Sequence, residues 1–587
     1  MLQIFKYLQK KEYLLILFSL VFIVTQVYLD LKLPDYMHEI TMLVQTEGSK
    51  MSDVLLQGGY MLLCAIGSMI ASIIVGFFAA KVAAGFSVRL RAMVFEKTMS
   101  FSIEEINGFS TASLITRSTN DITQIQLLIA MGLQVIVKAP ILAVWAVFKI
   151  MGKSWQWTAA TGFAVLFLVF MLCILIFVAM PKFKIIQSLT DNLNRVTREN
   201  LSGIRVVHAY NASKYQEKKF EEANSELTNT NLFTSRAMAI MMPTMGIIMS
   251  GMGLVIYWIG AFLINAAALP DRLSLFSDMI VFSSYAMQVI MAFMMLSFVF
   301  IMLPRASVSA KRIKEVLDTE ATIIDGNVTE GKNGLSGEIE FRNVSFKYPD
   351  AAEYILRNVS FTASKGETVA FIGSTGSGKS TLLNLIPRYF DATEGEVLVD
   401  GVNVKQYTQE SLRKKIGYVS QKAVLFSGTV TSNVAYGDNG KTSENETIVK
   451  NAIAIAQGTE FVEKMEDQYH AAIAQGGTNI SGGQKQRLSI ARAVYRGPEI
   501  YIFDDSFSAL DYKTDQVLRS KLKKETNDAT TLIVGQRIGT IKDADRIVVL
   551  DEGEVVGIGT HEELMQNCGV YQEIAYSQLS KEELEIG

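Results

Sequence analysis

Six long apolar runs in the first half of the chain constrain its fold more than any other feature. A helix needs roughly 20 consecutive apolar residues to cross about 30 Å of hydrocarbon. With 49% hydrophobic and 19% charged residues, the composition is also that of a membrane protein rather than a soluble one. We therefore predict an α-helical membrane domain over residues 1–305. Its six spans are expected at 13–33, 54–82, 128–150, 155–180, 236–266 and 273–303.

The remaining composition excludes several classes of protein. A net charge of −3 offers no basic surface for a nucleic-acid partner. The three cysteines lack the spacing of a disulfide scaffold, so we expect buried thiols at Cys64, Cys173 and Cys568. No small-residue cleavage site follows the first apolar run, which we interpret as an uncleaved span rather than a signal peptide.

Basic residues are unevenly distributed among the segments that join the spans. Residues 83–127 and 182–235 carry many lysines and arginines, whereas the other connections are short and carry few. Positive charge stays on the cytoplasmic side, so both termini and the C-terminal half are expected in the cytoplasm. The helical spacing of the two basic stretches predicts that the spans continue beyond the membrane. Without a transit-like leader, a bacterial cell membrane is the expected location.

Beyond residue 335 the pattern changes to that of a soluble domain. Short β-rich runs such as EIEFRNVSFKY and ETVAFIG alternate with polar, helix-like stretches. This alternation predicts an α/β domain over residues 335–587. Residues 306–334 form a charged linker, and its last part, GKNGLSG, has the composition of a loop.

A glycine-rich segment in this domain fits the pattern G-x-x-x-x-G-K-[ST] between a strand-like and a helix-like run. Its glycines allow backbone N–H groups to curl around phosphate oxygens. Lys379 would reach the β- and γ-phosphates, and the Ser380 hydroxyl would hold Mg²⁺. The segment therefore predicts a site for ATP and Mg²⁺, made of Gly373, Ser374, Thr375, Gly376, Ser377, Gly378, Lys379, Ser380 and Thr381.

A second nucleotide-binding signal lies near residue 500. The buried-strand pattern of residues 500–503 ends in Asp504, whose carboxylate is expected to hold Mg²⁺ through water. Such a run is common when it stands alone. Together with the glycine-rich segment it predicts an α/β P-loop nucleotide-binding domain.

Motifs along nearly the whole chain resemble those of ATP-binding-cassette (ABC) transporters. ISGGQ at 480–484 resembles the signature sequence of this family, and ENLSGIRVVHAY and LITRSTND resemble its cytoplasmic loops. The resemblance implies a half-transporter of the exporter class, with six spans followed by one cassette. It also implies an adenine-stacking aromatic at Tyr348, a glutamine that senses Mg²⁺ at Gln421 and a D-loop aspartate at Asp511.

The resemblance further implies a dimer. In this family ATP lies between two cassettes, and the signature of one covers the phosphates that the other binds. Short coupling helices near 114–122 and 210–218 would carry force between the cassettes and the membrane domain. The residues that would complete the ATP site of a partner chain are Ser481, Gly482, Gly483 and Gln484.

Two residues depart from the family's pattern at the position where water attacks ATP. Members that hydrolyse ATP well usually carry Glu where this chain has Asp505, whose side chain is roughly 1–1.5 Å shorter. They usually carry His where this chain has Gln536, a neutral amide that cannot become cationic. The resemblance gives no meaning to a third departure, Gln475, where exporters often have Glu.

The ATP-holding residues are intact, so these departures affect hydrolysis selectively. We expect the chain to bind MgATP, to hydrolyse it slowly and to complete an efficient site on a different partner subunit. That partner would carry the Glu and the His, as in heterodimeric exporters with one degenerate site. The alternative is a homodimer in which Asp505 still works.

Methionines recur at three- and four-residue steps in the last two spans, which places them on one face of each helix. Such flexible side chains suit a cavity for several apolar shapes, and the alternative is helix packing or a lipid-facing stripe. No charged side chain occurs in residues 237–270. Lys138 in span 3 is either functional or, as we expect, snorkels to the interface. The candidate substrate path is Met242, Met245, Met249, Met287, Met291, Met294 and Phe298.

These features favour one subunit of an ATP-driven exporter of hydrophobic or amphiphilic compounds such as drugs. A lipid flippase on the same scaffold and a nonhydrolysing regulatory subunit are the main alternatives. Peptide or bacteriocin export is a further one, although no peptidase domain precedes the first span. Import is disfavoured, because importers of the family usually keep their membrane and ATP-binding parts on separate chains.

Overall fold

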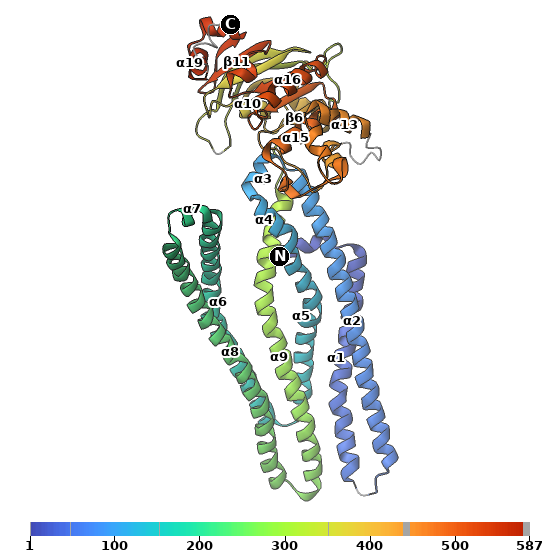
Figure 1. Ribbon diagram of the computed structural model, residues 1–587. Helices are drawn as coiled ribbons and strands as arrows, with labels where there is room; N and C mark the ends of the chain where they lie inside the picture. Colours follow the sequence, from blue (N-terminus) through green and yellow to red (C-terminus); the bar gives the residue numbers. More distant parts are fainter. Residues whose placement is uncertain (1, 47, 152, 350, 438–445, 579–587) are drawn as a thin grey trace. The chain divides into compact units, whose positions relative to one another are not determined.

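The chain forms two units of different structural class. The computed structural model describes residues 2–46, 48–151, 153–349, 351–437 and 446–578. The helical unit comprises Met1–Met99 and Thr111–Thr319, and the α/β unit comprises Ser100–Ser110 and Glu320–Gly587. Figure 1 shows long helices in the first unit and mixed strands and helices in the second. The predicted fold class is confirmed.

The helical unit contains, among the described residues, six helices long and apolar enough to cross a membrane, which confirms the six predicted spans. The helices extend beyond the apolar runs, as the basic stretches predict: α2 ends at Met99 and α8 begins at Ser213. The elements are η1 (Leu2–Tyr7), α1 (Lys10–Gln45), α2 (Met51–Met99), α4 (Thr111–Thr116), η2 (Arg117–Asp121, a π-helix), α5 (Ile122–Met151), α6 (Trp155–Ser202), α7 (Ile204–Ala209), α8 (Ser213–Ala266) and α9 (Leu269–Asp318).

The long helices pack in pairs through apolar side chains. α1 packs along α2, α5 along α9 and α6 along α8, and α7 joins the ends of α6 and α8 (Figure 1). Trp157 of α6 is 1% exposed, and its indole N–H donates to the carbonyl oxygen of Ile256 in α8 at 3.1 Å. This hydrogen bond satisfies the ring's polar atom, so the whole indole can be buried between the helices.

Ionisable side chains of the helical unit pair with one another. Lys138 lies near the middle of α5, and its ammonium is 3.1 Å from the carboxylate of Asp30 in α1. Lys149, also in α5, is 2.7 Å from the carboxylate of Asp35 in α1. The expectation that Lys138 snorkels to the interface is therefore wrong, because a carboxylate inside the bundle neutralises its charge.

A short helix upstream of α4 belongs to the α/β unit. α3 (Ile103–Phe109) begins with a capping box between Ser102 and Glu105, and Ile103 packs against the core of the α/β unit. The backbone N–H of Thr322 donates to the Glu105 carboxylate at 2.8 Å. The predicted coupling segment 114–122 lies instead in the helical unit. A coupling role for that segment stays a prediction, which made no use of the Ser-x-x-Glu cap that starts α3 at Ile103.

The α/β unit is built on two larger sheets and one pair of strands. One sheet has the order β2-β1-β4-β5, the other β12-β11-β3-β10-β9-β6, and β7 pairs with β8. The strands are β1 (Ile339–Phe346), β2 (Leu356–Ala363), β3 (Thr368–Gly373), β4 (Glu394–Val399), β5 (Val402–Asn403), β6 (Ile416–Val419), β7 (Gly428–Thr429), β8 (Ala472–Ile473), β9 (Ile500–Asp504), β10 (Thr530–Val534), β11 (Arg546–Asp551) and β12 (Glu554–Gly559).

Besides a smaller core around Ile547 and Tyr571, two apolar cores divide the described part of this unit. One contains Phe341, Phe371 and Leu382 and joins the two larger sheets to α10. The other contains Val449, Leu488 and Leu518 and lies among the helices from α12 to α16. The helices are α10 (Lys379–Leu385), η3 (Val404–Gln406), α11 (Gln409–Lys414), α12 (Val430–Val434), α13 (Glu446–Ile455), α14 (Thr459–Glu463), η4 (Gln468–His470), η5 (Gln475–Gly477), α15 (Gly482–Arg496), α16 (Tyr512–Glu525), α17 (Ile538–Ile541), α18 (His561–Asn567) and α19 (Gly569–Gln578).

Candidate nucleotide-binding site

Parallel strands bring the predicted nucleotide-binding segments to one edge of the larger sheet. β10 lies between β3 and β9, and its last residue, Val534, pairs with Phe371 on one side and Asp504 on the other. The carboxyl ends of such strands meet at one edge, where ligands of open α/β sheets bind. The glycine-rich segment after β3, Asp505 after β9 and Gln536 after β10 are therefore neighbours.

The glycine-rich segment joins β3 to α10, as predicted. Gly376 and Gly378 have φ values of 90° and 93°, a left-handed conformation that glycine adopts without strain. A Cβ at Gly378 would also lie only 2.7 Å from the Leu356 side chain. Ser374, Thr375 and Gly376 are exposed, so the outer part of the loop is open to a ligand.

Lys379 lies at the start of α10 with its ammonium group held against the loop. Its Nζ donates to the carbonyl oxygens of Gly373 at 2.9 Å and Ser374 at 2.7 Å. Burial lowers the pKa of Lys379, while the nearby carboxylates of Asp505 and Asp504 oppose that change. An ammonium in this place can exchange carbonyl oxygens for phosphate oxygens, which form stronger, charge-assisted hydrogen bonds.

Ser380 and Asp504, two of the predicted magnesium ligands, are in direct contact. The Ser380 hydroxyl donates to Asp504 Oδ1 at 2.7 Å. Burial raises the pKa of Asp504, although hydrogen bonds from Ser380 and Tyr418 act in the opposite direction. Hydroxyl and carboxylate oxygens suit Mg²⁺, so this pair fits a magnesium site. Among the described residues no group of three or more His, Cys, Asp or Glu could hold a metal, so the ion would also need oxygens from phosphate and water.

One carboxylate oxygen of Asp505 accepts hydrogen bonds from two side-chain amides. Gln536 Nε2 donates to Asp505 Oδ2 at 2.7 Å, and Gln421 Nε2 donates to the same oxygen at 3.1 Å. Asp505 itself is 7% exposed. The structure thus brings together the glutamine predicted to sense Mg²⁺ and both residues that depart from the family's catalytic pattern.

Tyr348 lies next to the phosphate-binding segment. Its hydroxyl is 3.1 Å from Thr381 Oγ1, at the start of α10. Its ring packs at near right angles to Phe346 and Phe390, with centroid distances of 5.0 and 5.3 Å. The half-buried ring is thus fixed beside the loop, where the predicted adenine contact would be made.

The signature residues lie in a different part of the α/β unit. Ser481 caps α15, accepting from Gln484 N at 3.3 Å, and Ser481 and Gly482 are exposed. α15 packs in the core among helices α12 to α16, whereas α10 packs in the core between the sheets. Within the described ranges no hydrogen bond joins Ser481 or Gln484 to the glycine-rich segment.

The predicted D-loop aspartate is also a helix cap. Asp511 Oδ1 accepts from the backbone N–H of Thr514 at 3.0 Å at the start of α16, and this hydrogen bond lowers the pKa of Asp511. The preceding Ala509 lies beside the signature, since a Cβ at Gly483 would be 3.2 Å from the Ala509 carbonyl oxygen. The D-loop and the signature therefore form one exposed surface.

Two family models match the chain. One, described as ABC transporter transmembrane region, matches residues 14–293, and the other, described as ABC transporter, matches residues 356–508. An "uncharacterized ABC transporter ATP-binding protein" of Mycobacterium bovis is 40% identical over 89% of this chain and 87% of its own length. The chain belongs to the ABC transporters. Membership in this family implies ATP binding and ATPase-coupled transport by a multi-pass membrane protein.

More distant proteins also resemble the transporter along most of its length. An ATP-dependent lipid A-core flippase of Pseudomonas aeruginosa is 30% identical over 86% of this chain and 81% of its own length. The solved structure of a bacterial Atm1-family ABC exporter with ATP bound has a TM-score of 0.80, 23% identity, and coverage of 96% and 98% of the two chains. The transporter thus has the architecture of an exporter half-transporter.

The methionines of the transporter's candidate substrate path occupy different environments. Met245 of α8 is 5% exposed. Met249 and Met294 pack against the apolar core that α8 and α9 share. Met287 is half-buried, whereas Met291 is 40% exposed. The burial of Met245 agrees with the helix-packing alternative, and the substrate path stays a prediction for all of these residues. The side chains of Met242 and Phe298 lie outside the described residues.

The transporter's site contains one residue that sequence reasoning missed. Tyr418 of β6 donates to Asn384 Oδ1 at 3.1 Å and approaches Asp504 Oδ2 at 3.4 Å. Burial raises the pKa of the Tyr418 phenol, so it remains a hydrogen-bond donor at neutral pH. Its position directly before the V-S-Q of the Gln421 motif was an available signal, because β6 ends at the same sheet edge.

Proposed function

We propose that this transporter is the degenerate-site subunit of a heterodimeric exporter of hydrophobic or amphiphilic compounds. Its own ATP site would bind MgATP tightly and hydrolyse it slowly, and its signature would complete the efficient site of a different subunit. The observation that carries the proposal is the pair of hydrogen bonds from Gln421 and Gln536 to one oxygen of Asp505.

The geometry of Asp505 supports slow hydrolysis. A general base must lie within hydrogen-bond reach of the water that it activates. Asp505 Oδ2 already accepts two amide N–H groups, and the aspartate side chain is one methylene shorter than the glutamate usual in the family. A shift of about 1 Å can reduce a rate on the order of 100-fold.

Gln536 supports the same conclusion. Its amide N–H donates to Asp505 at 2.7 Å, and the side chain is uncharged at both low and high pH. A histidine at this position could become a cation beside the developing negative charge of the reaction. The residues expected to hold ATP and Mg²⁺, by contrast, are those usual in the family: Lys379, Ser380 and Asp504, with the Ser380 hydroxyl bonded to Asp504.

The exposed signature supports the proposal of a second subunit. Ser481 and Gly482 are exposed, and α15 and α10 pack in separate cores. One chain therefore supplies one phosphate-binding loop and one signature, each of which needs its complement from another chain. We place this assembly in a bacterial cell membrane, with the ATP-binding parts and both termini in the cytoplasm.

The proposed substrate class rests on the apolar character of the C-terminal half of α8. The segment 237–270 carries no charged side chain, so it offers no fixed counter-ion to a charged substrate. A lipid flippase is the second candidate, favoured by the 30% identical relatives that are named lipid A-core flippases. Drug-stimulated and lipid-stimulated ATPase activities of the reconstituted pair would separate the two candidates.

The degenerate site can be tested by restoring the family's residues. The ATPase activity of the purified chain is measured alone and with candidate partner subunits, for the wild type and for the double variant D505E/Q536H. We expect little ATPase activity from the wild-type chain alone. In the heterodimer that contains D505E/Q536H, the rate of hydrolysis at this chain's own site should be on the order of 100-fold higher than in the heterodimer that contains the wild type. Brisk turnover by the lone chain, abolished by Asp505→Asn, would overturn the proposal in favour of a homodimer.

A third reading, a nonhydrolysing regulatory subunit, rests on the same residues Asp505 and Gln536. It predicts that the reconstituted pair retains ATP at this chain's site but moves no substrate. Transport of a fluorescent amphiphile into inside-out vesicles by the pair, and not by the partner alone, would support the exporter instead.

A further inference from the structure

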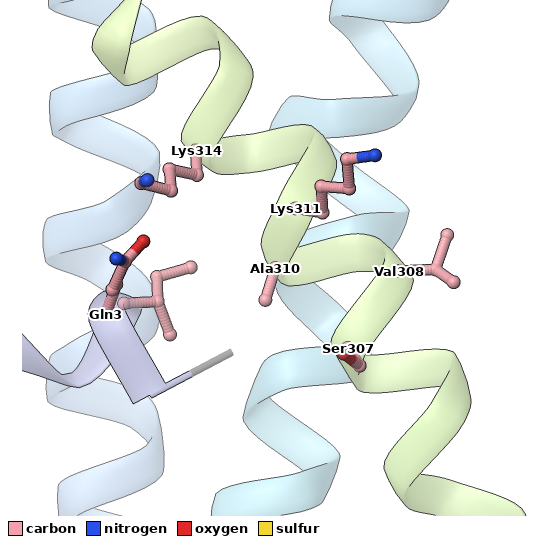
Figure 2. A pocket seen from close by; sticks show the side chains of 7 residues that line it. Gln3, Ser307, Val308, Ala310, Lys311 and Lys314 are labelled. Carbon is pink, nitrogen blue, oxygen red and sulfur yellow. The ribbon is translucent and has the colours of Figure 1, made fainter.

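A cavity of about 330 Å³ lies where the N-terminal helix η1 meets the last turns of α9 (Figure 2). Both elements belong to the helical unit. The cavity is separate from the ATP-binding residues and from the candidate methionine path. Its lining combines apolar side chains, including Ile4 and Val308, with the polar side chains of Gln3, Lys311 and Lys314.

The wall that η1 provides is firmly held. Ile4 is 2% exposed, and the Phe5 ring stacks on Phe86 of α2 with a centroid distance of 6.3 Å. Arg89 of α2 donates to the carbonyl oxygen of Tyr7 at 2.6 Å, which ties the end of η1 to α2. The cavity is thus largely preformed, so a ligand would not have to order η1 on binding.

The charge of the lining is positive. No acidic side chain lines the cavity in the part of the chain that the structure describes. Lys311 makes no ion pair there, and Lys314 pairs at 3.2 Å with Asp318, which lies outside the lining. Figure 2 shows the Lys314 ammonium extending from α9 toward the Gln3 amide, with Lys311 directed along the other side of α9. Two lysines thus stand against one nearby carboxylate, so the cavity carries a net positive charge that favours an anion.

The position of the cavity along the helices matches the head groups of a membrane. The last apolar run ends at about residue 303, only a few residues before the cavity, and the first begins at about residue 13, shortly after η1. Val308 is 60% exposed, although it adjoins the cavity. An anionic group here would thus have apolar surface next to it and the hydrocarbon edge close by, and basic pockets at this depth attract acidic lipids.

We propose that this cavity binds the anionic head group of a membrane phospholipid, in the leaflet on the side of the N-terminus. The phosphate would lie between Lys314 and Gln3, with Lys311 at the rim and an acyl chain along Val308. A zwitterionic lipid would bring a cation to the same lysines and bind more weakly. This inference does not depend on the ATP site.

The test is lipid binding to the full-length chain in a neutral detergent, measured by native mass spectrometry. Phosphatidylglycerol and phosphatidylcholine with identical acyl chains are titrated separately, and inorganic phosphate is added as a competitor. The variants are K311Q/K314Q and, as an independent change at an exposed side chain, Gln3→Glu. K414Q/K464Q is the matched control, because each of these exposed lysines forms a one-turn ion pair like that of Lys314.

We expect the wild type and the control to prefer phosphatidylglycerol, and phosphate not to displace it. K311Q/K314Q should weaken phosphatidylglycerol binding roughly 10- to 30-fold and leave phosphatidylcholine binding unchanged. Gln3→Glu should also weaken phosphatidylglycerol binding, because it places a negative charge beside the proposed phosphate. An unchanged preference in both variants, equal binding of the two lipids by the wild type, or displacement by phosphate alone would overturn the proposal.

Discussion

At the scale of single residues, Lys138 and Asp30 form an ion pair within the helical unit whose two members depend on each other. Their side chains are 17% and 25% exposed, and their charged atoms are 3.1 Å apart. Lys138→Met leaves the Asp30 carboxylate without its cation, which should destabilise the chain by about 1–3 kcal/mol, less than for a fully buried pair. The double variant D30N/K138M removes both charges and should be closer to the wild type in thermal unfolding.

Comparing Lys138→Met with D30N/K138M separates the contribution of the ion pair from that of the packing of the Lys138 side chain. If Lys138→Met and the double variant lower the melting temperature equally, the pair contributes nothing and Lys138 acts only through its aliphatic stem. Lys149→Met offers a parallel case, since Lys149 lies 2.7 Å from Asp35.

Sequence reasoning could identify the residue types of the site but not their hydrogen-bond partners. The resemblance to the ABC family identified Asp505, Gln536 and Gln421 as important positions. Only the structure shows that the two amides share one oxygen of Asp505, because the loops after three strands must first be folded together. The partner of Lys138 was missed for the same reason, since Asp30 is in another helix.

At the scale of elements, α3 is attached to the α/β unit through Glu105. The Glu105 carboxylate accepts from Thr322 N at 2.8 Å and from Ser102 N at 2.6 Å. Burial alone would raise its pKa, but these hydrogen bonds outweigh burial and the pKa of Glu105 is lowered. Ionised Glu105 therefore stabilises the fold above about pH 4.5, and this contribution is lost as the pH falls through its folded pKa.

Glu105→Gln should accordingly reduce stability at neutral pH by about 1–2 kcal/mol. Thermal unfolding of the full chain should show a difference from the wild type that is constant from about pH 7 to about pH 4.5 and shrinks as the pH falls further, through the lowered folded pKa of Glu105. Glu104→Gln is the control, because Glu104 begins the same helix without bonding to Thr322. A deficit that stays constant as the pH falls below about 4.5 would show that charge on Glu105 does not matter.

Periodicity predicted the long elements well because each apolar run is longer than a bilayer is thick. It could not place α3, which has only 7 residues and no apolar run of its own. The Ser102–Glu105 capping box was the usable local signal. The pairing of β10 with both β3 and β9 was likewise beyond reach, because strand order is set by contacts between distant segments.

At the scale of the whole molecule, the signature and the phosphate-binding loop of one chain should act on different ATP molecules. Lys379→Ala should abolish ATP binding by the purified chain, since it removes the cation of its own loop. Ser481→Ala should leave that binding intact but reduce the ATPase activity of the proposed heterodimer by at least about tenfold, if Ser481 contacts ATP across the proposed interface. Fluorescent-nucleotide binding and ATPase assays measure the two effects.

A cap variant elsewhere in the same unit controls for the loss of helix stability. Thr408 caps α11 as Ser481 caps α15, and each loss should cost about 1 kcal/mol. Thr408→Ala should therefore leave heterodimer turnover near the wild-type value. Equal losses of ATPase activity in Thr408→Ala and Ser481→Ala would contradict an ATP site shared between two subunits. A loss of ATP binding by the lone Ser481→Ala chain would contradict it as well.

The assignment of residues 100–110 to the α/β unit makes this unit discontinuous in the chain. A soluble fragment that starts at residue 320 would lack α3, leaving the Thr322 amide without the Glu105 carboxylate and exposing the surface that Ile103 covers. Such a truncation is therefore an incomplete domain, and its solubility and nucleotide affinity would understate those of the intact protein. A peptide spanning residues 100–110, added in trans or fused by a short linker, supplies what the cut removes.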